Sequence, residues 1–176
     1  MYTADWLNVL HAADTLLNQC ESLVADLSDV VYTSESTVLP GGTVGKHLRH
    51  LVDHYHAIVS ASGNTQPIDY DHRLRDVPME LDRAHALRTL ASLRRALVDL
   101  KPLGHAAPVT VRVMVTGDGT CATLGTTLGR ELAFATHHGV HHQAMMRAIV
   151  GEFGVEITSD FGKAPSTIHH ELSTKR

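Results

Sequence analysis

The sequence lacks several features that mark common classes of protein. Its two cysteines, Cys20 and Cys121, lie far apart and form no C-x-x-C motif, which argues against a disulfide framework or a thiolate zinc site. No stretch approaches the roughly 18 apolar residues that a membrane-spanning helix needs. Residues 1–28 also lack a charged segment followed by a continuous apolar run. We therefore expect a soluble protein of a reducing compartment, the cytoplasm, without membrane contact.

Clusters of basic residues are absent too. Lys and Arg are scattered, and the formal net charge of -4 provides no positive field for a phosphate backbone, so we expect no nucleic-acid partner. The chain contains no G-x-S-x-G motif and no phosphate-binding glycine loop, which disfavours a serine hydrolase and a nucleotide-binding protein. The sequence shows no internal repeat of about 20–50 residues, which argues against a solenoid.

The composition that is present is that of an ordinary globular protein. Hydrophobic residues make up 43% and charged residues 19% of the 176 residues. A chain of this length comfortably supports one hydrophobic core, whereas two cores would each be thin. We therefore predict a single domain over residues 1–176.

Apolar residues recur at intervals of three and four along four segments, which indicates amphipathic helices. The predicted helices cover residues 5–27, a segment capped at Thr43 that runs to about residue 62, residues 80–100 and residues 127–151. Residues 109–115 and 120–126 flank a Gly-Asp-Gly turn and predict a β-hairpin. The expected fold is an all-α four-helix bundle with a short β-hairpin before the last helix, and the tail after residue 153 is expected to pack along the surface.

Histidine is unusually frequent, with 14 residues, and eight of them fall within residues 47–56 and 137–142. On the last predicted helix, His138 and His142 share the apolar face, whereas His141 lies at its edge and His137 points towards solvent. Residues four apart lie one helical turn above each other, with Cβ atoms about 5–6 Å apart, so their imidazoles can meet at one ion. This spacing predicts a pair of metal ligands.

A third ligand has to come from elsewhere, because zinc sites usually take at least three protein ligands. The second predicted helix carries His47, His50 and His54 on one side, and its apolar stripe lies slightly nearer to His47 and His54 than to His50. Periodicity alone does not choose among these three. A cluster of pH-sensing histidines is the alternative interpretation.

Two motifs resemble those of the DinB/YfiT-like superfamily: Thr43-Val-Gly-Lys-His-Leu-Arg-His50 and His138-Gly-Val-His-His142-Gln. The resemblance spans almost the whole chain and implies an up-down-down-up bundle. It also implies one metal-binding histidine on the second helix and an H-x-x-x-H pair on the last. The matching positions are His50, His138 and His142, so the resemblance favours His50 as the third ligand.

Members of this superfamily include thiol-dependent S-transferases, a thiol-dependent isomerase and proteins without an assigned reaction. The resemblance implies a divalent metal ion as cofactor, zinc or nickel first and iron or copper also compatible with imidazole. We expect a metal-dependent enzyme of the S-transferase or hydrolase type, acting on a small-molecule substrate with a low-molecular-weight thiol. The alternative is a non-catalytic, stress-related protein that binds a metal or small ligand. A homodimer is also expected.

Further residues near the histidines supply candidates for catalysis. His54 or His47 is the candidate general base, and Asp53 or Asp71 the candidate group that orients an imidazole. The loop at residues 70–76 is similar to that of a subset of superfamily members, and its Arg73 and Arg75 are candidates for binding an anionic substrate. A solvated loop with internal ion pairs is the competing interpretation of that segment.

Overall fold

The protein is mostly helical and carries one small β-sheet. The computed structural model describes residues 2–63, 65–71 and 77–174. The helices are α1 (Ala4–Asp26), α2 (Asp29–Thr33), α3 (Val44–Ala61), η1 (Pro78–Glu80), α4 (Arg83–Asp99), η2 (Lys101–Leu103), α5 (Leu128–Glu152) and α6 (Pro165–Thr174). The strands are β1 (Ile68–Asp69), β2 (Pro108–Met114) and β3 (Cys121–Thr127).

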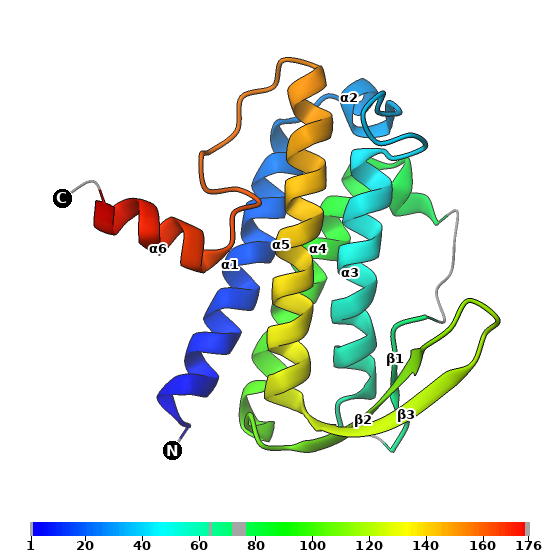
Figure 1. Ribbon diagram of the computed structural model, residues 1–176, viewed down its shortest axis with the longest axis vertical. Helices are drawn as coiled ribbons and strands as arrows, with labels where there is room; N and C mark the ends of the chain where they lie inside the picture. Colours follow the sequence, from blue (N-terminus) through cyan, green and yellow to red (C-terminus); the bar gives the residue numbers. More distant parts are fainter. Residues whose placement is uncertain (1, 64, 72–76, 175–176) are drawn as a thin grey trace.

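The four long helices lie side by side. Helix α3 packs against α5 and α4, and α1 packs against α4 and α5. Figure 1 shows α1 and α5 running upwards and α3 and α4 running downwards. The contacts agree with these directions: Arg83, at the start of α4, binds Asp29 of α2, and Trp6, near the start of α1, donates from its indole nitrogen to the carbonyl of Lys101.

Local sequence signals explain where the long helices begin. The hydroxyl oxygens of Thr3, Thr43 and Thr127 and the carboxylate of Asp82 accept hydrogen bonds from first-turn N–H groups of α1, α3, α5 and α4. One face of each helix is apolar, and these faces share a core that includes Leu17, Leu48 and Leu132. The predicted helices at these four places, and the predicted cap at Thr43, are confirmed.

The predicted hairpin is present, and it belongs to a larger sheet than expected. Strands β2 and β3 are antiparallel, with Val111 opposite Leu124. Strand β1 adds to the other edge of β2 in parallel, with Ile68 opposite Val111. The loop between α3 and α4 is therefore fastened to the hairpin, and it brings Tyr70 towards α5.

The tail after α5 differs in part from the prediction. Its first portion does pack on the bundle, because Phe161 is buried and Arg147 donates to the carbonyls of Thr158, Ser159 and Phe161. Its last portion does not, because α6 projects away from the long helices and buries none of its residues (Figure 1). Among the described residues, no helix has the length and apolarity to cross a membrane.

Candidate metal centre

Three histidines from two helices converge at the interface between α3 and α5. The Nε2 atom of His138 lies 3.2 Å from Nε2 of His50 and 3.1 Å from Nε2 of His142. The potential ligand atoms of the three residues all lie within 4.8 Å of one another. The structure thus brings together the three residues named as metal ligands from the sequence, at separations that a single ion can bridge.

The packing of α5 explains why this pair of histidines faces α3. His138 and His142 are four residues apart and lie one turn above each other on the same face. Gly139, between them, packs against α1, where a Cβ would approach the Cδ atoms of Leu16 to 2.9 and 3.0 Å. A glycine here lets α5 lie close to α1 while its histidines turn towards α3.

His47 lies beside the triad rather than in it. Its Nδ1 atom is 3.2 Å from Nδ1 of His142, so the two rings share one hydrogen bond. If Nε2 of His142 directs its lone pair at a metal ion, its neutral ring carries the proton on Nδ1 and donates it to His47. The contact therefore orients the ring of His142.

His54 is buried one helical turn beyond His50 on α3, whereas His47 lies one turn before it. Its Nδ1 donates to the backbone carbonyl oxygen of His50 at 2.9 Å, and its ring stacks on Tyr70 with centroids 4.8 Å apart. The ring centroid also lies 4.3 Å from that of His138. Because Nδ1 holds the proton, Nε2 of His54 is left as the acceptor nitrogen of the neutral ring.

Two aromatic side chains, Tyr70 from the loop noted in the sequence and Phe134, which the sequence did not single out, pack against the histidines. The ring of Phe134 stacks on His138 with centroids 5.9 Å apart, and it also lies 5.6 Å from the ring of Tyr70. The hydroxyl of Tyr70 donates to the buried carboxylate of Glu131 at 2.8 Å. A glutamate on the buried face of an amphipathic helix was the available signal for this contact, because a buried carboxylate requires a partner.

The two aspartates proposed as orienting groups bind elsewhere. Asp53 accepts from Arg49 at 2.7 Å, and Arg49 also lies 2.6 Å from the buried carboxylate of Glu80. Asp71 accepts from the backbone N–H of Met114 at 2.6 Å, although its charge lies near enough to His54 to favour the protonated ring. Arg73 and Arg75, the candidates for substrate binding, lie outside the described residues.

Burial keeps several of these imidazoles neutral. Removal from water lowers the pKa of His142 to about 3, with a further contribution from His138, and lowers the pKa of His54 to about 4. Burial lowers the pKa of His47 as well. Neutral imidazole is the form that donates a lone pair to a metal ion, so the surroundings of the cluster favour ligation.

The cysteines contribute nothing to this site in the described part of the chain. Cys20 is a free thiol buried next to the side-chain amide of Gln143, and Cys121 is a free thiol on β3. Among the described histidine, cysteine, aspartate and glutamate side chains, the group formed by His50, His138 and His142 is the one whose ligand atoms converge.

The sequence matches no family model, and it matches no solved structure. It is similar to a protein named FK506-binding protein 5 from Rhizopus delemar, with 28% identity over 118 residues. The matched region is 66% of this chain and 31% of that protein, so the chain spans about a third of the length of the relative it matches.

Proposed function

We propose that this chain is a DinB/YfiT-like metalloprotein in which His50, His138 and His142 hold one divalent metal ion, and that it is a metal-dependent enzyme. The observation that carries the proposal is the convergence of three imidazoles without a fourth protein ligand among the described residues. Metal sites with three protein ligands and an open position are typical of catalysis, whereas structural sites are closed by a fourth ligand.

The course of the chain supports the assignment to this superfamily. Its four long helices run up, down, down and up, and a hairpin precedes the last of them (Figure 1). The two motifs with ligand histidines lie on the facing helices α3 and α5, as the resemblance requires. Zinc and nickel are the first candidates for the ion, and iron and copper are also compatible with three imidazoles.

The proposed reaction is the transfer or hydrolysis of a group on a small molecule, with a low-molecular-weight thiol as co-substrate in the transferase case. When bound at the triad, a divalent ion supplies a Lewis acid that lowers the pKa of a water or thiol in the open position. His54 is the proposed general base, because its Nε2 is an acceptor and its ring lies against His138. His47 is assigned a positioning role, because its Nδ1 faces His142.

Elemental analysis of tag-free protein tests the metal site. We expect about one metal ion per chain in the wild type and loss of most of it in His50→Ala, His138→Ala and His142→Ala. His137→Ala is the matched control, because this exposed neighbour on α5 points away from the triad. Full metal content in all three triad variants would refute the proposed site.

A second candidate function is a non-catalytic metal protein in which a fourth imidazole closes the site. The position of His54, with its ring 4.3 Å from that of His138, favours this candidate. Cobalt-substituted protein separates the two functions. Addition of a small thiol produces thiolate-to-cobalt charge-transfer absorption if a position is open, and leaves the spectrum unchanged if four histidines fill the coordination shell.

A further inference from the structure

The two helices α1 and α5 form a groove that is covered over only part of its length. At the end nearer to Glu156, the tail lies across it, with Phe161 buried and Gly162 donating its N–H to Gln143. At the other end the groove stays open, with a volume of about 220 Å³, and its lining includes Val9, Ala12, Ala133, Val140 and Pro165. The described residues that line this open end include no acidic, lysine or arginine side chain.

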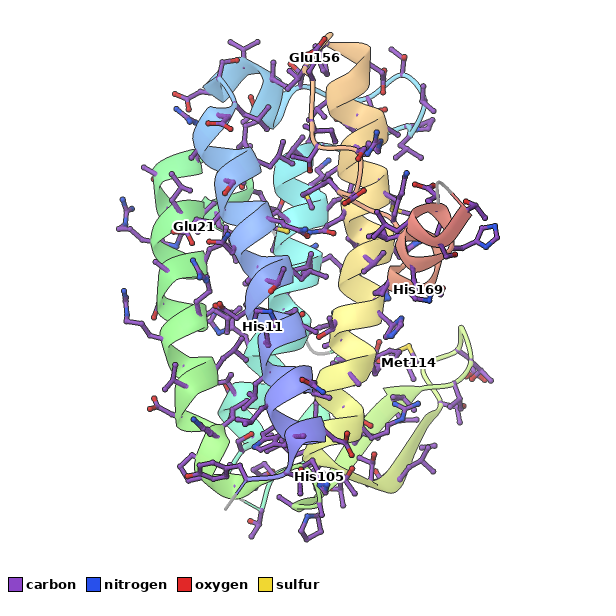
Figure 2. The ribbon with its side chains drawn as sticks, turned by 90° about the vertical axis from the view of Figure 1, so that its left-hand side faces the viewer. His11, Glu21, His105, Met114, Glu156 and His169 are labelled. Carbon is purple, nitrogen blue, oxygen red and sulfur yellow. The ribbon has the colours of Figure 1, made fainter. Side chains whose placement is uncertain are left out.

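Helix α6 begins at the edge of this open groove but does not fill it. Pro165, its first residue, lines the groove, yet none of the residues of α6 is buried. Figure 1 shows α6 projecting away from the long helices, and Figure 2 shows it, marked by His169, beside α5 on the side away from α1. Ile168 and Leu172, four residues apart on α6, present an apolar stripe, and Leu172 is 63% exposed.

The base of α6 is firmly held. Arg147 binds three carbonyls of the preceding segment, and Gly162 packs directly on the backbone of Ala144. Lys163 then forms an ion pair with Glu171, which links the segment before α6 to the middle of that helix. For α6 to fold back over its own groove, the chain would have to turn at residues 163–164 and break this pair.

We propose that α6 docks into the open α1–α5 groove of a second copy of this chain, and that the exchange is reciprocal. Pro165 lines the groove and is also the first residue of α6. A two-fold axis that passes beside this residue therefore places the α6 helix of each copy over the groove of the other copy. The surfaces match in polarity. The groove lining carries no acidic, lysine or arginine side chain, and the formal charge of Glu171 on α6 is already paired with Lys163.

Sedimentation analysis of the full chain tests this dimer. We expect the wild type to be a dimer, and Leu172→Asp on α6 and Ala12→Arg in the groove each to be monomers at the same protein concentration. Val98→Asp is the control, because Val98 is 66% exposed on α4 and lies outside the groove, so this variant remains dimeric. Circular dichroism of each variant establishes that it is folded.

Cross-linking distinguishes exchange between copies from folding back within one copy. In a background with Cys121→Ser, chains carrying Ala12→Cys are mixed with chains carrying Leu172→Cys and treated with a flexible bismaleimide. A covalent product of two chains supports the proposal. Three results would each overturn it: a monomeric wild type, a dimer that survives both Leu172→Asp and Ala12→Arg, or, in a variant that carries both Ala12→Cys and Leu172→Cys, cross-linking confined to single chains.

Discussion

At the scale of single residues, the contact between His47 and His142 is the most informative part of the candidate site. A metal-ligating histidine usually donates its second ring nitrogen to a carboxylate, a carbonyl or a water molecule. Here the partner is another imidazole, 3.2 Å away from Nδ1 to Nδ1. The pair requires a neutral acceptor nitrogen on His47, and burial supports this by lowering the pKa of His47.

Loss of this contact should weaken metal binding without abolishing it. We expect His47→Ala to lower the affinity for zinc about 10-fold, in the range known for partners of metal ligands. His47→Gln retains an acceptor and should recover part of the loss. Competition with a chromophoric chelator measures these affinities, and His137→Ala provides the baseline. An affinity for His47→Ala equal to that baseline would show that His47 does not position His142.

The buried imidazoles should also make the metal-free protein sensitive to acid. The pKa of His54 is lowered from 6.5 to about 4, and that of His142 is lowered further, both mainly by burial. Below about pH 6.5 the unfolded chain therefore binds protons that the folded chain does not, so the stability present above pH 6.5 is lost as the pH falls towards 4. Each group contributes a slope of at most about 1.4 kcal/mol per pH unit.

Urea unfolding of chelator-treated protein between these pH values measures this effect. The free energy of unfolding should decrease on acidification, and the decrease should be smaller in a variant such as His54→Phe, which keeps an aromatic ring beside Tyr70. A free energy that stays constant or increases over the same range would contradict the prediction.

At the scale of elements, the position of α3 depends on a glycine. A Cβ on Gly45 would lie 2.1 Å from the carbonyl oxygen of Glu80, a backbone atom of η1 that cannot move independently. We expect Gly45→Ala to destabilise the fold by about 1–3 kcal/mol or more, since it forces η1 away from α3. The same displacement would disturb the ion pair between Arg49 and Glu80. Thermal and denaturant unfolding measure the loss.

A glycine on α5 is the control for that substitution. Gly151 is exposed near the end of the helix, and a Cβ there meets nothing within 4 Å. Gly151→Ala should therefore leave stability unchanged or raise it by up to about 1 kcal/mol, because alanine loses less backbone entropy in a helix. Equal effects of the two substitutions would show that contact with Glu80 is not the cause.

Elements with a long periodic pattern were predictable, and short ones were not. The four long helices span three or more turns each, so their apolar stripes are unambiguous, and the hairpin has a Gly-Asp-Gly turn between alternating strands. Strand β1 has two residues and helix α2 has five, which is too short for a period to appear. Helix α6 buries none of its residues in the single chain, so no stripe facing the core marks it in the sequence.

At the scale of the whole molecule, the candidate site shows what periodicity leaves undetermined. The pattern of α5 identified His138 and His142, because both lie on its apolar face. The pattern of α3 placed His47, His50 and His54 on one side without choosing among them. That choice depends on the position of α3 along its axis relative to α5, which the packing between the two helices sets. The apolar stripe of α3 lies slightly nearer to His47 and His54. In the structure, however, His50 is the residue whose Nε2 lies 3.2 Å from Nε2 of His138.

Because the triad joins α3 to α5, a bound metal ion should stabilise the whole fold. The two helices lie far apart in the sequence, and the unfolded chain does not preassemble their histidines, so the ion binds the folded state preferentially. At a free concentration of about 100 times the dissociation constant, this preference adds about 2.7 kcal/mol. Removing the metal with a chelator should therefore lower the melting temperature by several degrees, and added zinc or nickel should restore it.

The triad variants separate this linkage from a general effect of the chelator. His142→Ala should melt at the same temperature with and without chelator, because it lacks the site, whereas His137→Ala should respond as the wild type does. If the wild type melts at the same temperature in both conditions while elemental analysis shows that metal has been lost, the ion does not join α3 to α5 in the folded state. A chelator effect of equal size in His142→Ala would place the stabilising ion at another site.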